Sequence, residues 1–405
     1  MTPIFLVLFT LASVGDAQVI WQKLNGPTDH SIQCIAIDTS GHLFVGTQNI
    51  GVYRSTDDGN TWQARIQNGN DPRALAISPS GIIFCGSWGA CVQRSTDNGL
   101  NWKNVTGNMT NKQVLTLAIK SDGTIFTSST GLSSCVYCST DSGASWASSW
   151  AAGTLTEWVK TFAFGSDGTV YAGGTGIHYS TDNGSTWQYP LQRYTINALV
   201  INAGGEIFAG TESNGLLTST DKGKSWSLPT LSGLTVKALI IDPKGRIYAG
   251  TTTGKVSAIY QSSDAGATWT ETDSGMSKST VSCFAIGPNG HLYAGTGGGV
   301  YETTGSVAAE EKVEKAVPQA FSLSQNYPNP FNPTTTIEYA VSSKQYVWLN
   351  VYNVLGEKVA TLVNETKSAG RYHAKFDGSS LPSGVYFYRI QAATYTETKK
   401  LLLMK

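Results

Sequence analysis

Short apolar strands separated by glycine turns recur along most of this chain. Each copy has an apolar segment of strand length, a turn, and then the pattern Gly-x-[Ile/Leu/Val]-[Phe/Tyr]. The copies are spaced about 42 residues apart on average, with no helical periodicity. A period of this size predicts a propeller whose blades are four-stranded sheets. The seven copies carry this turn at Gly41, Gly81, Gly123, Gly168, Gly205, Gly245 and Gly290.

A second pattern, Ser-[Ser/Thr]-Asp-x-Gly-x-x-Trp, follows the third expected strand in six of the copies. An Asp at this place accepts hydrogen bonds from nearby backbone N–H groups, and the Gly supplies a positive φ. The Trp places a large ring between neighbouring blades. We therefore expect these aspartates to shape turns and not to catalyse a reaction. They are Asp57, Asp97, Asp141, Asp182, Asp221 and Asp264.

These six segments resemble the Asp boxes, or BNR repeats, of sialidases, sortilin-type receptors, xyloglucan-cleaving glycosidases and photosystem II assembly-factor propellers. The resemblance covers residues 19–305 and implies an all-β fold, a seven-bladed β-propeller. Families with Asp boxes include both enzymes and pure binding proteins. The resemblance therefore indicates the fold and leaves the activity open.

The two ends of the repeat region complement each other. The seventh copy stops at Gly305 without an Asp box or a fourth strand, whereas residues 19–24 (Val-Ile-Trp-Gln-Lys-Leu) have the pattern of the missing strand. We expect this N-terminal strand to pair with the last blade and close the ring, which removes exposed strand edges. Before it, a short apolar run followed by Gly15-Asp16-Ala17 predicts a signal peptide over residues 1–17.

Export through a signal peptide would bring the six cysteines into a compartment where disulfides form. Cys34 and Cys283 hold equivalent strand positions in the first and last copies, so they are one hypothetical disulfide pair across the seam. Cys85 and Cys91 flank one loop and are a second hypothetical pair.

Composition excludes some functions. Charged residues make up only 14% of the chain, and 28 basic residues balance 28 acidic ones. A polybasic nucleic-acid binder is therefore not expected. Cys135-x-x-Cys138 has neither a second CxxC nor a His at ligand spacing, so we expect no metal site and no required cofactor. We also expect a monomer.

The C-terminal region has a different character. Residues 305–320 are charge-rich and end near a proline, which indicates a linker. Residues 321–405 contain stretches of alternating apolar and polar residues, which predict a small Ig-like β-sandwich. The predicted organisation is a signal peptide (1–17), a propeller (18–304), a linker (305–320) and this sandwich (321–405).

The sandwich closely resembles the type A sorting domain of the type IX secretion system. The matching segments are Leu323–Thr334, Val351–Val359, Leu381–Tyr386 and Lys399–Lys405. The resemblance implies recognition by the type IX machinery and export across the outer membrane. It also implies that the protein is secreted or held on the cell surface. An ordinary Ig-like accessory domain is the alternative interpretation.

Loops that differ between copies lie on the face opposite the Asp boxes, and variable loops on a rigid scaffold usually carry binding residues. The third connection between blades contains two Trp residues outside the repeat pattern, Trp150 and Trp158. Flat aromatic rings suit sugars and peptide side chains. The candidate ligand-binding residues are Arg73, Trp88, Trp150, Glu157, Trp158, Tyr189, Arg193, Tyr194 and Glu212.

We favour a non-catalytic propeller that binds an extracellular glycan or protein. The alternative is a glycoside hydrolase, sialidase-like or polysaccharide-cleaving, which would need two suitably spaced carboxylates. Besides Glu157 and Glu212, the variable face offers only Asp71, Glu271 and Asp273 for that role. A third interpretation is an assembly-factor-like propeller, which fits poorly with a type IX address because such factors act inside the envelope.

Overall fold

The described chain is built from strands and turns. The computed structural model describes residues 19–27, 30–67, 71–109, 113–130, 135–149, 158–191, 193–254, 256–307, 320–326, 328–367, 370–393 and 395–404. Within these ranges there is no helix, and so none that could cross a membrane. The chain divides into two compact units, residues 1–309 and 310–405. The all-β prediction is therefore confirmed.

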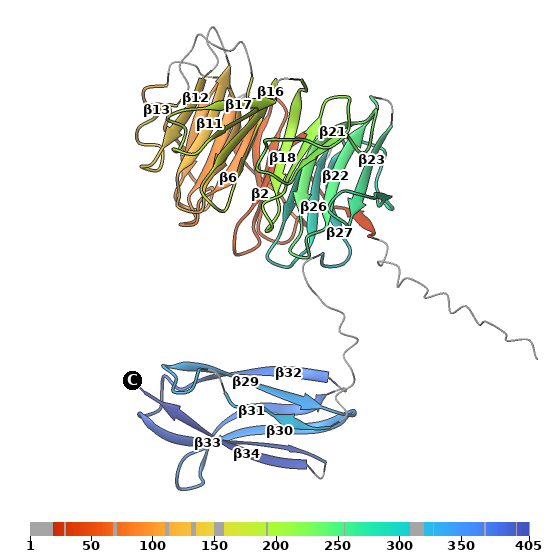
Figure 1. Ribbon diagram of the computed structural model, residues 1–405. Coiled ribbons are helices and arrows are strands. Elements are labelled where there is room, and N and C mark those ends of the chain that lie inside the picture. The colour runs from red at the N-terminus through yellow and green to blue at the C-terminus, as the bar shows by residue number, and fades with distance from the viewer. Residues whose placement is uncertain are drawn as a thin grey trace, which may run out of the picture. The chain divides into compact units, whose positions relative to one another are not determined.

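Each repeat of the first unit folds into one group of antiparallel strands (Figure 1). Strands that follow one another along the chain pair in order, so each group is a meander. The first three groups are β2 (Ile32–Ile37), β3 (Leu43–Thr47), β4 (Gly51–Ser55) and β5 (Gln63–Gln67); β6 (Asp71–Ile77), β7 (Ile83–Trp88), β8 (Cys91–Ser95) and β9 (Lys103–Asn104); and β10 (Gln113–Ile119), β11 (Ile125–Thr130), β12 (Cys135–Ser139) and β13 (Ala147–Ser148). One pairing, Gln113 with Trp88, joins the second and third groups into a single sheet.

The remaining groups follow the same order with two variations. In the fifth group, a bridge between Leu216 and Thr230 stands in place of a fourth strand. In the seventh, the fourth strand comes from the other end of the chain. These groups are β14 (Thr161–Phe164), β15 (Val170–Gly174), β16 (Gly176–Ser180) and β17 (Gln188–Leu191); β18 (Ile196–Ile201), β19 (Ile207–Thr211) and β20 (Leu216–Ser219); β21 (Thr235–Ile241), β22 (Ile247–Thr252), β23 (Ser257–Ser262) and β24 (Thr270–Glu271); and β25 (Val281–Ile286), β26 (Leu292–Thr296), β27 (Gly299–Thr303) and β1 (Trp21–Lys23).

The first strand of each group, called its inner strand, contacts the inner strands of the groups before and after it. These contacts run in chain order from β2 through β6, β10, β14, β18, β21 and β25, and β25 contacts β2 again. The inner strands therefore form a closed ring. We call the end that carries the first hairpin turns and the Asp turns the turn face, and the opposite end the loop face.

The N-terminal strand closes this ring as expected. β1 pairs with β27, with Trp21 opposite Thr303 and Lys23 opposite Tyr301. The Trp21 side chain is 2% exposed, and its Nε1 donates to Thr272 O at 2.7 Å. Trp146 in the third group makes the same kind of bond, because its Nε1 donates to a backbone oxygen of the preceding group at 2.8 Å. Trp21 thus supplies the ring that the seventh repeat lacks.

Small residues in the second strand of each group let neighbouring groups pack closely. A Cβ added to Gly46 would lie 2.7 Å from the Cβ of Pro72 in the next inner strand. In the third group, Ser128 takes this place, and its hydroxyl donates to Val159 O of the fourth group at 2.6 Å. A larger side chain at either position would push the adjacent group outward.

The two predicted disulfides do not form. Cys34 packs between the first and second groups, with its Sγ 3.8 Å from Pro72 O. Cys283 packs between the seventh and first groups. Equivalent positions in successive groups face the same way around a ring, so these thiols cannot face each other. Cys85 and Cys91 likewise belong to core clusters on opposite sides of the second group.

The second unit consists of two antiparallel sheets that enclose one core. Its strands are β28 (Ser322–Leu323), β29 (Thr334–Val341), β30 (Gln345–Tyr352), β31 (Lys358–Lys367), β32 (Gly370–Asp377), β33 (Gly384–Ala392) and β34 (Tyr395–Leu403). The sheet orders are β28-β29-β32 and β31-β30-β33-β34. Tyr388 is fully buried in this core, and its hydroxyl donates to Ser324 O at 2.7 Å and accepts from Asn326 N at 2.9 Å.

Candidate functional site

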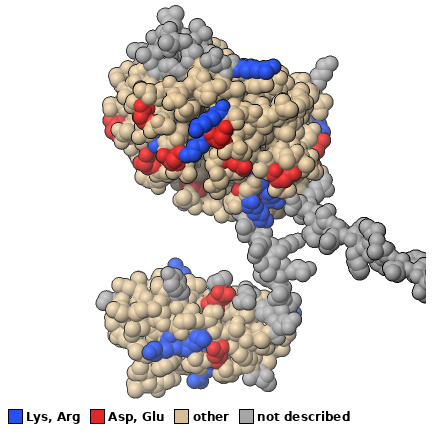
Figure 2. Space-filling view, in the orientation of Figure 1, with Lys and Arg blue, Asp and Glu red and all other residues tan. Residues whose placement is uncertain are grey.

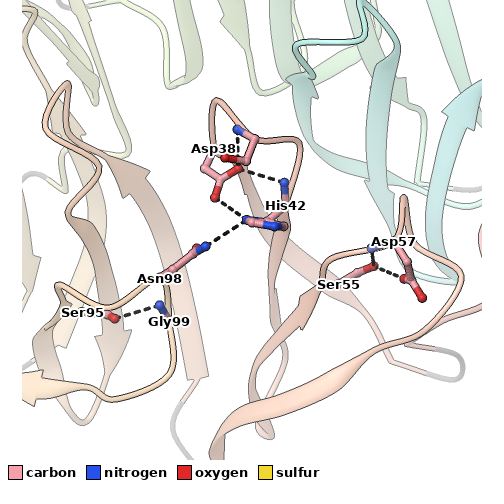
Figure 3. A network of polar contacts seen from close by, with 8 residues as sticks. Asp38, His42, Ser55, Asp57, Ser95, Asn98 and Gly99 are labelled. Atoms are coloured by element: carbon pink, nitrogen blue, oxygen red, sulfur yellow. Dashed lines mark hydrogen bonds and ion pairs between the residues drawn. The ribbon is translucent and has the colours of Figure 1, made fainter. Parts of the chain in front are cut away.

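The turn face is ordered by the six Asp turns, the Ser-[Ser/Thr]-Asp-x-Gly-x-x-Trp segments. In the first, the Ser55 hydroxyl donates to Asp57 Oδ1 at 2.8 Å and accepts from Gly59 N at 2.9 Å. Asp57 Oδ1 also accepts from Thr61 N at 2.9 Å, and Thr61 Oγ1 donates to Asp57 Oδ2 at 2.6 Å. Figure 3 shows the bond between Ser55 and Asp57 and, in the next turn, the bond from Gly99 N to the Ser95 hydroxyl, which corresponds to the bond from Gly59 N to Ser55. The carboxylate oxygens are therefore occupied by the turn itself.

These hydrogen bonds favour the ionised form of each carboxylate. The pKa of Asp57 lies below its usual value, chiefly because of the Thr61 hydroxyl. In the other turns, bonds from the residue four positions after the Asp are the largest cause, and they lower the pKa to about 2. Carboxylates of this kind do not act as proton donors near neutral pH.

A polar network links the turn faces of the first and second groups (Figure 3). His42 Nδ1 lies 2.7 Å from Asp38 Oδ2 and 2.9 Å from the side-chain amide of Asn98. With the Asn98 amide oriented so that its oxygen faces His42, this oxygen accepts hydrogen bonds from His42 Nδ1 at 2.9 Å and from Arg54 Nη2 at 3.1 Å. Asn98 is the residue after the Asp of an Asp turn and has a φ of 58°.

The residue that follows the Asp also links neighbouring groups in other Asp turns, so this network has a structural role. Asn183 Oδ1 accepts from Lys120 Nζ at 2.6 Å, and Lys222 Nζ donates to Asp167 Oδ2 at 2.7 Å. A cavity of about 330 Å³ lies nearby, between the first hairpin turns of the first three groups. Its lining includes Asp38 and Lys120, whose charged atoms already bond to the protein.

On the loop face, the structure brings together two of the predicted candidates, Arg73 and Trp88. The Arg73 guanidinium carbon lies 5.8 Å from the centre of the Trp88 ring. The same guanidinium forms an ion pair with Asp71 at 2.5 Å, and its Nη1 lies 3.5 Å from Gln33 Oε1. Because Asp71 is buried, this pair fixes the position of the guanidinium.

Glu212 is paired with a residue that the sequence analysis did not name, Lys160. Lys160 Nζ lies 3.0 Å from Glu212 Oε2 and 2.9 Å from Asn197 Oδ1 of the next inner strand. Trp158, two residues before this lysine, is 50% exposed. Trp150 and Glu157 lie outside the described residues.

The remaining candidates form two separate aromatic contacts. Tyr189 stacks on His178 with ring centres 3.8 Å apart, and its hydroxyl donates to Thr175 O. The Arg193 guanidinium lies 5.7 Å from the centre of the Tyr194 ring. Tyr189 therefore braces its own group, whereas Arg193 is exposed at the surface.

The sequence analysis missed a feature of the inner strands. In six of them, the pairing with the second strand skips one residue near the loop face, which is a β-bulge. In the fourth group, Lys160 holds the equivalent place, and its backbone N–H donates to Gly173 O at 2.7 Å. We call these seven positions the bulge ring. Its members are Gln33, Arg73, Leu115, Lys160, Asn197, Lys237 and Ser282.

Carboxylates of the loop face are paired with cations where the structure describes them. Besides the pairs of Asp71 and Glu212, Lys278 Nζ lies 3.0 Å from Glu271 and 2.6 Å from Asp273. These two hydrogen bonds raise the pKa of Lys278, the one from Asp273 most. Figure 2 shows the wider picture on one face, where charged side chains stand singly or in small mixed groups on a mostly uncharged surface.

Comparison with known proteins identifies the C-terminal region. Residues 325–404 match the family described as the secretion system C-terminal sorting domain. This domain confirms the expected type IX address, and it implies interaction with the type IX machinery. The protein is therefore exported and is either secreted or located at the cell surface. No curated protein sequence matches the chain.

Solved structures of propeller proteins resemble the chain at low sequence identity. YCF48 bound to D1 peptide has 14% identity and a TM-score of 0.57, covering 72% of this chain and 98% of that one. PorZ, a bacterial surface component of the type IX system of Porphyromonas gingivalis, has 15% identity and a TM-score of 0.57, covering 94% of this chain and 60% of that one. A virginiamycin B lyase from Staphylococcus aureus with quinupristin has 14% identity and a TM-score of 0.60, covering 71% of this chain and 99% of that one. At these identities the resemblance concerns the fold alone.

Proposed function

We propose that this chain, whose residues 325–404 are a type IX sorting domain, is a seven-bladed Asp-box propeller that binds an extracellular glycan or protein without catalysis. The Ig-like sandwich serves export, and the propeller is the functional cargo. The observation that carries the proposal is the loop face, where Arg73, Trp88, Lys160 and Glu212 present polar and aromatic groups.

The pairing of the loop-face carboxylates supports binding over hydrolysis. A glycoside hydrolase uses two carboxyl groups that reach the glycosidic bond, one as an acid and the other as a base or nucleophile. Asp71, Glu212 and Asp273 each form an ion pair with a Lys or Arg nitrogen within 3.0 Å, so the protein itself engages these carboxylates. The similarity to PorZ, which is described as a surface component, also agrees with a role outside the cell.

The first test is binding of the full chain to an array of extracellular glycans, with Trp158→Ala as the comparison variant. We expect specific binding that the variant loses, because Trp158 exposes half of its side chain beside Lys160. A matched control is Leu228→Ala, since Leu228 is also highly exposed and lies in the fifth group away from the bulge positions. Release of reducing sugar from a bound glycan, abolished by Glu212→Gln, would contradict the proposal.

A further inference from the structure

The bulge ring has an unusual charge distribution. Three of its seven positions are cationic (Arg73, Lys160 and Lys237) and none is acidic, although the chain as a whole has equal numbers of basic and acidic residues. A bulge bends its strand and changes the direction of the side chain there, and bulges are common beside binding sites. Here they recur at the same level of a closed ring of inner strands. The arrangement places three cationic side chains at this level of the loop face, of which Arg73 and Lys160 are paired with Asp71 and Glu212.

Neighbouring members of the bulge ring touch one another through their side chains. Arg73 approaches Gln33 of the first group, and Lys160 bonds to Asn197 of the fifth. Asn197 Nδ2 in turn donates to Val236 O of the sixth group at 3.4 Å. These contacts hold the side chains in place before any ligand arrives, which lowers the entropic cost of binding.

From this arrangement we propose that the bulge ring binds the carboxylate groups of an acidic, uronate-containing extracellular glycan. The inference rests on the proposed binding function and names its ligand class. Lys160 has three N–H donors, of which Asn197 and Glu212 use two. Lys237 is exposed and makes no ion pair with any residue that the structure describes. Both ammonium groups therefore have donors left for a carboxylate.

The ion pair between Lys160 and Glu212 does not block this site. Glu212 has a side-chain exposure of 55%, and exposed ion pairs contribute only about 0–1 kcal/mol. A ligand carboxylate can therefore replace Glu212 at Lys160 at little cost. Arg73 differs because buried Asp71 and the Trp88 ring hold its guanidinium firmly. Asp71 balances its charge, so Arg73 adds no free positive charge and serves to hold the position of the Trp88 ring beside it.

Aromatic residues beside the cations favour a sugar over an acidic peptide. Trp158 precedes Lys160 by two residues and is half exposed, and Trp88 lies under Arg73. A flat indole packs against the C–H face of a pyranose ring, while the neighbouring cation binds the carboxylate of the same residue. An exposed indole and a cation with a donor left thus occur together at Trp158 and Lys160, whereas the Trp88 ring already packs against Arg73.

The experiment is calorimetric titration of the full chain with oligogalacturonate, compared with a neutral galactose oligosaccharide of equal length and with an oligoglutamate. We expect oligogalacturonate alone to bind, with an affinity that falls as salt rises. Lys160→Gln and Lys237→Gln should each weaken binding about tenfold, the size typical of a lost charge-assisted hydrogen bond. Glu212→Gln should strengthen it a few-fold, because it removes the competing carboxylate.

The control is Lys244→Gln, which removes a cation from the turn face and should leave the affinity unchanged. Binding of neutral glycans only would overturn the ligand class and leave the proposed function standing. Binding of oligoglutamate with equal affinity would overturn the assignment to a glycan. Unchanged affinity in Lys160→Gln and Lys237→Gln would remove the bulge ring from the site. If none of the three probes binds, the inference fails, and the glycan array decides separately whether the proposed function stands.

Discussion

One serine hydroxyl in each Asp turn contributes strongly to the conformation of the turn face. Each Asp turn has a buried serine whose hydroxyl joins the Asp carboxylate to the backbone N–H of the following Gly. In the fourth group, Ser180 Oγ donates to Asp182 Oδ1 and accepts from Gly184 N, both at 2.7 Å. The φ of Gly184 is 84°, which other residues rarely adopt. The hydroxyl and the glycine therefore define the turn together.

Ser180→Ala should destabilise the first unit by about 1–3 kcal/mol, because it leaves the buried Gly184 N–H without a partner. Urea denaturation followed by tryptophan fluorescence measures the change. Ser185→Ala is the control, because the Ser185 hydroxyl is exposed and bonds to Asp182 O, and we expect a change within about 0.5 kcal/mol. Equal effects of the two substitutions would argue against a structural role for the buried hydroxyl.

Acid should weaken the first unit between about pH 4 and pH 2. Hydrogen bonds, chiefly from the Thr186 hydroxyl, lower the pKa of Asp182 to about 2 in the folded state, whereas an unfolded Asp titrates near 3.9. A depressed folded-state pKa stabilises the protein above the unfolded value, and this stabilisation is lost as pH falls through the folded value. Urea midpoints measured from pH 7 down to pH 2 test this.

The variant Asp182→Asn has no carboxylate at this turn, so its midpoint should fall less steeply over the same acid range. The control variant Asp377→Asn changes an aspartate of the second unit, so the urea midpoint of its first unit should fall with pH as steeply as in the parent chain. An identical slope in Asp182→Asn and the parent chain would show that this turn does not contribute to acid sensitivity.

Among the strands, β1 is short but contributes a buried aromatic side chain to the seam of the ring. It has three residues, yet Trp21 is buried in the core of the last two groups beside Tyr248 and Tyr301. Trp21→Ala should cost about 3–5 kcal/mol, the usual range for deleting a buried aromatic ring. Lys23→Ala, an exposed position of the same strand, should have little effect in the same urea titration. A small effect of Trp21→Ala would mean that the ring holds without its N-terminal strand.

The thiols provide a second test of how the strands pack. Burial raises the pKa of Cys85 and Cys283 to about 12, so both stay protonated and unreactive in the native protein. Iodoacetamide should not modify Cys34, Cys85 and Cys283 in the folded chain. After unfolding it should modify all three, with no reductant added. Peptide mass mapping before and after unfolding shows this. Cysteines that need reductant even after unfolding would indicate disulfides instead.

Repetition explains which elements were predictable. The role of Trp21 could be inferred because the seventh repeat lacks the Trp that six other copies have. The structure does not contain the predicted pair of Cys34 and Cys283. Side chains at equivalent positions of neighbouring groups point in the same direction around the ring, and the spacing of cysteines along the chain does not show this. The bulge ring was missed because a bulge shifts strand pairing by one residue without disturbing the apolar pattern. Arg73 was recognised as a candidate, whereas Lys160 was not named although it follows the candidate Trp158 by two residues.

At the scale of the whole molecule, the repeat region and the sorting domain belong to two separate compact units. Val307 still belongs to the first unit, where it is buried and its N–H donates to Gly290 O at 2.7 Å. The first compact unit therefore includes residues beyond Gly305, where the seventh repeat ends. The second unit has a complete core of its own, which includes Tyr339, Leu349 and Tyr388.

Removal of residues 325–404 should stop delivery to the medium or the cell surface, because those residues are the sorting domain. Cell fractionation in a host with an active type IX system measures delivery. The near-ultraviolet circular dichroism of the truncated chain should still report a folded first unit, since its core lies before residue 310. Truncated protein in the medium would contradict the assignment.

The pairing of β1 with β27 also sets the order of events during synthesis. Trp21 must wait for Thr272 and Thr303, partners that emerge long after it, so closure is a contact of very high sequence separation and correspondingly slow. Until then both ends of the ring expose an unpaired strand edge, which invites aggregation and proteolysis. A chain that stops early never loses these edges. The seam therefore removes the open strand edges only after synthesis has reached Thr303, and this point precedes the sorting domain in the chain.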